Sequence, residues 1–127
     1  MRKVIYTLIL TLVPGLCLAD DHTRVAAMYK CKLHDGHEAE EVMAANKKWL
    51  VNARKAGGSE EINSYMMEPE VGDFGHFLFI DSYPDLATWA KVQDAGDTAE
   101  SQAVEAMLDG VMECEKSRLY TSSKTNP

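Results

Sequence analysis

The spacing of hydrophobic residues in the first half of the chain changes from two to three or four, and each spacing predicts one kind of element. Residues 25–33 place an apolar or aromatic residue at every second position, which is typical of a strand. Residues 38–56 carry apolar residues three and four positions apart, which predicts a helix. Acidic residues lie near its start and Lys or Arg near its end, where each charge interacts favourably with the helix dipole. Gly57-Gly58 is expected to end this helix.

The second half of the chain predicts two strands, a helix broken in two and a last strand. Tyr83-Pro84-Asp85 ends the more apolar of the two strands, and Asp85 is well suited to cap the following helix. Gly96-Asp97 interrupts that helix. The elements expected here are strands over 61–67 and 76–82, a helix over 86–93, a helix that carries Ala103 and Val111 and ends near Met112, and a strand over 114–121.

The order of these elements is β-α-β-β-α-β, which is the ferredoxin-like arrangement. It predicts an α+β fold in which four antiparallel strands form one sheet and the helices cover one face. The first and the last strand are then neighbours in space. We assign this domain to residues 20–121 and expect residues 122–127 to form a frayed tail.

The first 19 residues have the pattern of a secretory signal peptide. Arg2 and Lys3 precede an apolar run over residues 4–18, and Ala19 supplies a small residue before the predicted cleavage point. The run is shorter than the roughly 20 residues that a membrane span needs. We therefore predict that residues 1–19 are removed and that the mature protein is exported, to the periplasm or beyond, without a membrane anchor.

The charge of the mature chain argues against two classes of partner. The whole chain has 13 Lys and Arg and 20 Asp and Glu. Because two of the basic residues leave with residues 1–19, the mature net charge is 11 minus 20, or −9. Such a surface repels nucleic acid and anionic membranes.

Cys31 and Cys114 are the cysteines that remain once Cys17 is removed, and an even pair in an oxidising compartment favours a disulfide. Antiparallel pairing of the first and last strands can place the two thiols opposite each other, which also matches opposite charges across the strands. The alternative is two buried free thiols. The other pairs in this register are Lys30 with Glu115, Lys32 with Glu113 and Ala26 with Leu119.

The segment 77–86, FLFIDSYPDL, together with the element order and the length of the chain, resembles the dimeric α+β barrel superfamily. That superfamily includes antibiotic-biosynthesis monooxygenases, stress-responsive barrel proteins and NIPSNAP-like proteins. The resemblance implies two sheets packed face to face in a dimer, with a cavity between sheet and helices in each subunit. Members that oxidise polyketides or degrade haem use an Asn on the first strand with a Trp and a His. The first strand here has no Asn, and Trp89 and His76 match in residue type only, so no catalytic role is transferred.

The strand over 76–82 is apolar on both faces, which also predicts a homodimer. Phe77 and Phe79 alternate with Leu78 and Ile80, so helices can bury one set and a second sheet the other. Lys30 and Lys32 share the second face, so part of it must stay polar or pair with Glu115 and Glu113. The further apolar residues expected on this face are Ala26, Met28 and Leu119.

No phosphate loop, nucleophile elbow, zinc-type cysteine pair or metalloprotease motif occurs after residue 19, so we predict no cofactor and no metal. His34 and His37 lack an evident third ligand. Cleavage after Ala19 would place His22 third in the chain, where a free amine, two amides and an imidazole can bind Cu(II) or Ni(II).

Polar and aromatic residues at inward positions are the candidates for a small-molecule pocket. Asn46 shares its helical stripe with apolar residues and needs partners near the sheet, and His76 could contact a ligand or transfer a proton. Core packing is the alternative for each aromatic residue. The candidate ligand-binding residues are Asn46, Trp49, Tyr65, His76 and Trp89, with Tyr29 as a further inward-facing aromatic.

Two functions follow from these patterns. The first is a non-enzymatic exported domain that binds a small, partly apolar ligand or a partner. The second is a cofactor-independent monooxygenase or isomerase that acts on an aromatic or polyketide-like substrate, with a residue such as His76 assisting proton removal. A cavity that holds a titratable side chain with a perturbed pKa would favour the enzyme, and a filled core would favour the binding domain.

Overall fold

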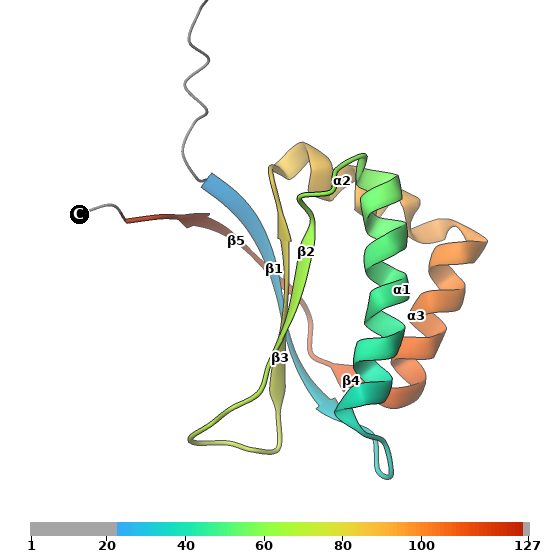
Figure 1. Ribbon diagram of the computed structural model, residues 1–127, viewed down its shortest axis with the longest axis vertical. Coiled ribbons are helices and arrows are strands. Elements are labelled where there is room, and N and C mark those ends of the chain that lie inside the picture. Colours follow the sequence, from blue (N-terminus) through green and yellow to red (C-terminus); the bar gives the residue numbers. More distant parts are fainter. Residues whose placement is uncertain (1–22, 126–127) are drawn as a thin grey trace, which may run out of the picture.

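A computed structural model describes residues 23–125 (Figure 1). The predicted signal peptide, residues 1–19, and His22 lie outside the described residues. Within residues 23–125, no helix is both long enough and apolar enough to cross a membrane.

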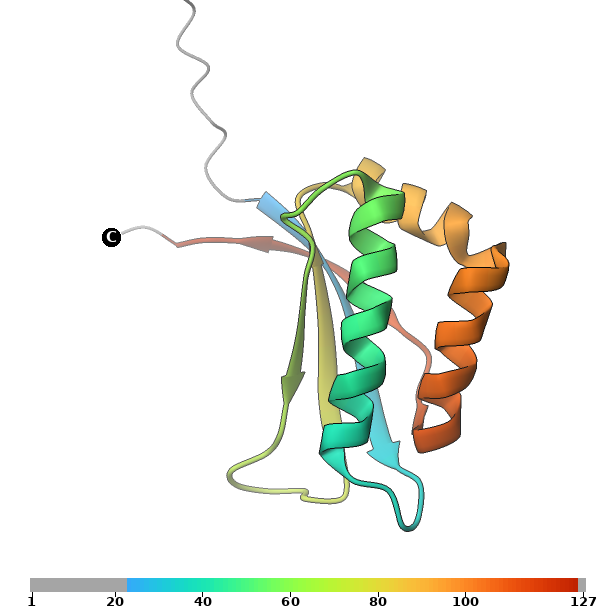
Figure 2. The same ribbon diagram turned by 45° about the vertical axis from the view of Figure 1, so that its right-hand side comes forward.

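The elements form a two-layer α+β fold, as predicted, with the helices side by side on one face of an antiparallel sheet (Figure 2). The predicted break in the second helix is confirmed, because a short 3-10 turn separates two α-helices. The bounds are β1 Thr23–Leu33, α1 Ala39–Gly57, β2 Asn63–Met67, β3 Phe77–Tyr83, α2 Leu86–Asp94, the 3-10 turn Ala95–Asp97, α3 Ala99–Val111, β4 Met112–Cys114 and β5 Arg118–Ser123.

The helix ends follow the predicted capping residues. Asp85 accepts a hydrogen bond from the backbone N–H of Thr88 at 2.7 Å and caps α2. Gly58 ends α1 in the left-handed conformation, with φ of 65°, which glycine adopts without strain. Gly57 allows a close approach, since a Cβ atom there would lie 2.7 Å from Ile62 Cδ1 and the Ile62 side chain would have to move. This close approach lets the end of α1 pack against Ile62 and against Thr88 and Val92 on α2.

The sheet order is β2-β3-β1-β4, and β5 also pairs with β1. The first and last strands are therefore neighbours, as the ferredoxin-like arrangement predicts. Cys31 lies opposite Cys114 in this pairing, and the two form a disulfide with 4.0 Å between their Cα atoms. The predicted ion pairs are also present, with Lys32 Nζ 2.8 Å from Glu113 Oε1 and Lys30 Nζ 3.8 Å from Glu115 Oε1.

The last strand differs from the prediction in one respect: it is broken into β4 and β5, so the sheet has five strands. Residues 115–117 insert one extra residue, and the register with β1 shifts by one. Ala26 therefore lies opposite Tyr120, whereas the sequence predicted Leu119. A shift of one residue exchanges the two faces of a strand, so Tyr120 takes the predicted place of Leu119. β5 ends at Ser123, inside the segment expected to be a tail.

Two clusters of buried apolar residues form the core between sheet and helices. The sheet supplies Val25, Ala27 and Tyr83 to one cluster, and Cys31, Phe77 and Phe79 to the other. Tyr29 packs against both clusters and lies where they meet. On β3, Asp81 occupies the inward position between Phe79 and Tyr83, so a carboxyl group falls between the clusters.

Candidate functional site

Asp81 is the carboxylate at the base of the candidate site, and only 6% of its surface is exposed. Ser64 lies beside it on β2 and donates from Oγ to Asp81 Oδ1. Asn46 on α1 donates from Nδ2 to Ser64 Oγ at 2.9 Å. The hydrogen-bond chain therefore runs from α1 across β2 to β3, and it fixes the orientation of the Asp81 carboxyl group.

The other carboxylate oxygen, Asp81 Oδ2, makes no hydrogen bond to any residue in the range 23–125. Among residues 23–125, Tyr83 Oη is the one side-chain oxygen or nitrogen atom that is fully buried and has no hydrogen-bond partner. Asp81 Oδ2, which also has no partner, is therefore not fully buried. Asp81 lines a pocket, so Oδ2 is the oxygen that a bound molecule can reach.

This pocket, called the helix-side pocket below, lies between α1, α3 and the sheet and has a volume of about 190 Å³. A space of about 100 Å³ adjoins it and shares Tyr29, Trp49 and Glu105. The floor is apolar at Phe79 and Met112. The lining includes the aromatic residues Tyr29, Trp49 and Phe79, the acidic residues Asp81, Glu105 and Asp109, and Asn46 and Leu108.

Burial dominates the electrostatics of the site. It raises the pKa of Asp81 to about 6, and the hydrogen bond from Ser64 lowers that pKa only in part. Burial, followed by the charges of Asp81 and Glu105, raises the pKa of Tyr29 to about 12. Tyr83 also has a raised pKa, for the same reasons of burial and the Asp81 charge. The pocket thus holds a carboxyl group that changes its charge near neutral pH.

We predict that Asp81 makes the stability of the fold depend on pH. Folding raises the pKa of Asp81 from its ordinary value of 3.8 to about 6. The protonated carboxyl group therefore stabilises the fold fully below about pH 4, and this stabilisation is lost as the pH rises through about 6. This change in the pKa of Asp81 corresponds to about 2 to 3 kcal/mol in the free energy of unfolding. Asp81→Asn should remove this difference between pH 4 and pH 7, as measured by urea unfolding.

Asp109→Asn is the matched control for this prediction, because it removes an exposed carboxylate from the same pocket. It should keep the pH profile of the wild-type protein. Equal profiles for the wild-type protein and Asp81→Asn would contradict the assignment of a raised pKa to Asp81.

The five candidate residues from the sequence do not all meet in one place. Asn46 and Trp49 both line the helix-side pocket. Trp89 lies on α2, packs against the core and is not in the lining. Tyr65, 53% exposed, lies opposite Ile80 on the face of the sheet away from the helices. His76 precedes β3 and has its Nδ1 2.8 Å from Asp73 Oδ2, outside the pocket.

Sequence reasoning missed Asp81, Ser64 and Glu105. A signal for Asp81 was present, because it alternates with Phe77, Phe79 and Tyr83 and is therefore a charged residue at an inward position of a strand. Ser64 and Glu105 had no comparable signal, since a small polar residue on a strand and an acid on a helix are both common at exposed positions.

The other two described histidines hydrogen-bond locally. His34 donates from Nε2 to the carbonyl oxygen of Asp109 at 3.0 Å, and His37 Nδ1 lies 3.1 Å from Glu41 Oε2. Within residues 23–125, no three His, Cys, Asp or Glu side chains are grouped so that they could hold a metal ion.

Neither a protein-family model nor a curated protein sequence matches the chain. Solved structures do match. SnoaB, a cofactor-independent oxygenase from Streptomyces nogalater, has a TM-score of 0.61 at 10% identity, over 84% of this chain and 99% of that chain.

Two further structures resemble this one to a similar extent. A NIPSNAP family protein from Agrobacterium tumefaciens has a TM-score of 0.55 at 12% identity, over 81% of this chain and 94% of that chain. A protein of unknown function from Bacteroides thetaiotaomicron, described as a possible oxidoreductase, has a TM-score of 0.54 at 12% identity, over 79% and 98%. The chain therefore shares the fold of these structures, in agreement with the α+β fold that its sequence predicted.

Proposed function

We propose that this protein is an exported domain that binds a small, partly apolar molecule in the helix-side pocket. The observation that carries this proposal is the free oxygen of Asp81, which lies at the base of a pocket walled by Trp49 and Tyr29. Such a pocket combines apolar walls with a few oriented polar groups, as small-molecule sites usually do. Its volume of about 190 Å³ restricts the ligand to a small molecule.

The energetic cost of burying Asp81 supports a functional role for this residue. A buried carboxylate without a cationic partner destabilises a protein, and an apolar residue of similar size would be tolerated better. The chain nevertheless places this group beside a cavity and orients it through Ser64 and Asn46. Groups with pKa values perturbed by burial gather at functional sites.

Export is part of the proposal, and two observations support it. Residues 1–19 have the charge and hydrophobicity pattern of a signal peptide. The Cys31–Cys114 disulfide is of the kind that persists in oxidising compartments.

The two tryptophans of the chain provide an experiment with an internal control. Trp49 lines the helix-side pocket and Trp89 does not. In proton–nitrogen NMR spectra with a library of small aromatic compounds, ligands should move the indole signal of Trp49 and leave that of Trp89 in place. Compounds that move both signals equally, or only that of Trp89, would contradict binding in this pocket.

A second candidate function, a cofactor-independent oxygenase or isomerase, is favoured by the same observation, a cavity that holds a carboxyl group with a perturbed pKa. We place it second because the first strand carries no Asn. A base is most effective when its pKa lies near the working pH, and that of Asp81 is about 6. Asp81 would then hold the proton-accepting role that the sequence suggested for His76. Oxygen uptake with a hydroxylated aromatic ketone, lost in Asp81→Asn, would support this function over simple binding.

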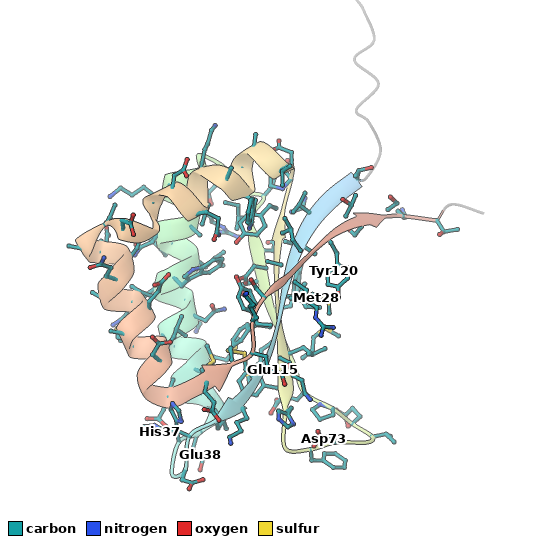
Figure 3. All side chains as sticks on the ribbon, turned by 180° about the vertical axis from the view of Figure 1, so that it is seen from behind. Met28, His37, Glu38, Asp73, Glu115 and Tyr120 are labelled. Carbon is teal, nitrogen blue, oxygen red and sulfur yellow. A yellow bond between two sulfur atoms is a disulfide. The ribbon has the colours of Figure 1, made fainter. Side chains whose placement is uncertain are left out.

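We also propose that the domain is a homodimer formed through the outer sheet face, the surface opposite the helices. Figure 3 shows Met28 and Tyr120 on this side of the sheet. An antiparallel sheet that faces water usually exposes polar residues, whereas this face is apolar in its centre. Its apolar residues are Met28, Tyr65, Met67, Leu78, Ile80 and Tyr120.

Polar contacts border this face at both ends, which suits the rim of an interface. Arg24 Nε donates to Ser82 Oγ at 2.8 Å at one end, and Lys30 pairs with Glu115 at the other. The apolar band between them can meet the same band of a second copy across a two-fold axis. Charged side chains also lie on this face, namely Arg24, the paired Lys30, and Arg118, which is opposite Met28.

A further inference from the structure

We propose that the ligand of the helix-side pocket is a small organic cation, an aryl or alkyl amine in its protonated form. This inference rests on the proposed binding function and adds the charge of the ligand. It follows from three features of the pocket: the sign of its charges, its aromatic walls and the hydrogen-bond role left open at Asp81.

All charged groups in the lining are acids. Asp81 lies at the base, while Glu105 and Asp109 come from α3 at the exposed side. Neither this pocket nor the adjoining space is lined by a Lys, Arg or His. Lys48 on α1 is not in either lining and has its Nζ 3.8 Å from Met107 Sδ on α3. An anionic ligand would therefore meet repulsion, whereas a cation would supply the missing charge.

The walls suit the same ligand. Tyr29 and Trp49 line the pocket beside Asp81, and Phe79 lies on its floor. The face of an aromatic ring attracts a cation, and the attraction grows when both are shielded from water. The combination of aromatic faces with a buried carboxylate is a chemical match for an ammonium group that carries an apolar substituent.

The hydrogen-bond chain leaves one atom of Asp81, the acceptor Oδ2, available to the ligand. Ser64 donates its hydroxyl proton to Asp81 Oδ1, and Asn46 in turn donates to Ser64. Asp81 Oδ2 stays free and, when ionised, can only accept a hydrogen bond. An ammonium N–H can donate to this oxygen, and the resulting bond is stronger than one from a neutral donor because both groups are charged.

Three probes of similar size and different charge test the proposal: benzylamine, benzyl alcohol and benzoate. Their dissociation constants would be measured at pH 7.5 from the Trp49 indole signal. Benzylamine should bind at least tenfold more tightly than benzyl alcohol, and benzoate should be the weakest. Lowering the pH to 5 should weaken benzylamine about tenfold, because Asp81 then becomes largely protonated while the amine keeps its charge.

Variants assign the effect to Asp81. Asp81→Asn should weaken benzylamine at least tenfold and change benzyl alcohol less than about twofold, because only the charged pair is lost. Glu105→Gln should give a smaller loss with benzylamine and serves as a second variant. Asp73→Asn, which removes a carboxylate from the loop between β2 and β3, outside the pocket, should leave all three constants unchanged.

The outcomes separate the two proposals. If benzyl alcohol or benzoate binds as tightly as benzylamine and moves Trp49, the pocket is a binding site but the ligand is not a cation. If none of the three probes moves Trp49, the cation proposal fails, and the wider compound library then decides whether the pocket binds a ligand at all.

Discussion

Replacing Cys31 and Cys114 together by alanine should lower the free energy of unfolding by about 2 to 5 kcal/mol. The disulfide joins residues 83 positions apart, so it restricts nearly the whole domain in the unfolded state. The loop-entropy relation gives about 4.5 kcal/mol for a loop of this length. For a domain of about 100 residues, such a loss lowers the melting temperature by about 10 °C or more.

The measurement is thermal and urea unfolding of the wild-type protein, the double variant and the wild-type protein under reducing conditions. The reduced protein and the double variant should be similarly destabilised, while their circular dichroism at low temperature should still show the native secondary structure. Alanine avoids burying a hydroxyl group at residue 31, which is only 1% exposed. Equal melting temperatures for all three samples, or two free thiols in the exported protein, would contradict the prediction.

Ile80→Asp should weaken the proposed homodimer at least a hundredfold. Ile80 lies on β3 in the middle of the outer sheet face, opposite Met28 on β1 and Tyr65 on β2. Two-fold symmetry would place the substitution in the interface twice, so each dimer would bury two carboxylates without partners. A loss of about 3 kcal/mol corresponds to a hundredfold change in the dissociation constant.

Sedimentation equilibrium at micromolar concentration measures this effect. Val51→Asp is the control, because Val51 is 67% exposed on α1 and lies on the opposite side of the molecule from the outer sheet face. This variant should sediment as the wild-type dimer does. A wild-type protein that remains a monomer at these concentrations would overturn the homodimer and leave an apolar sheet face exposed to water.

The sequence predicted the fold because each strand and helix carried its own hydrophobic period. Cys31, Lys32 and their partners Cys114 and Glu113 were also sufficient for the register of β1 with β4. The register of β5 could not be predicted in the same way. One extra residue between two short strands leaves their hydrophobic pattern almost unchanged, so the sequence predicted Leu119 on the outer sheet face, where the structure places Tyr120.

The pocket was harder to predict than the fold because it depends on how α1 and α3 lie over the sheet. Periodicity identified Asn46 and Trp49 as inward-facing, but it did not show that Ser64 would be the partner of Asn46. His76 was favoured as a titratable group because of its side-chain chemistry. Asp81 became the stronger candidate only once its burial was known.

The position of a bound ligand tests the central claim most directly. In a protein with carbon-13 labelled methyl groups, the aromatic protons of benzylamine should give nuclear Overhauser effects to the methyl groups of Leu108, which lines the helix-side pocket. They should give none to the methyl groups of Ile80 on the outer sheet face. Contacts to Ile80 without contacts to Leu108 would contradict a binding site between the helices and the sheet.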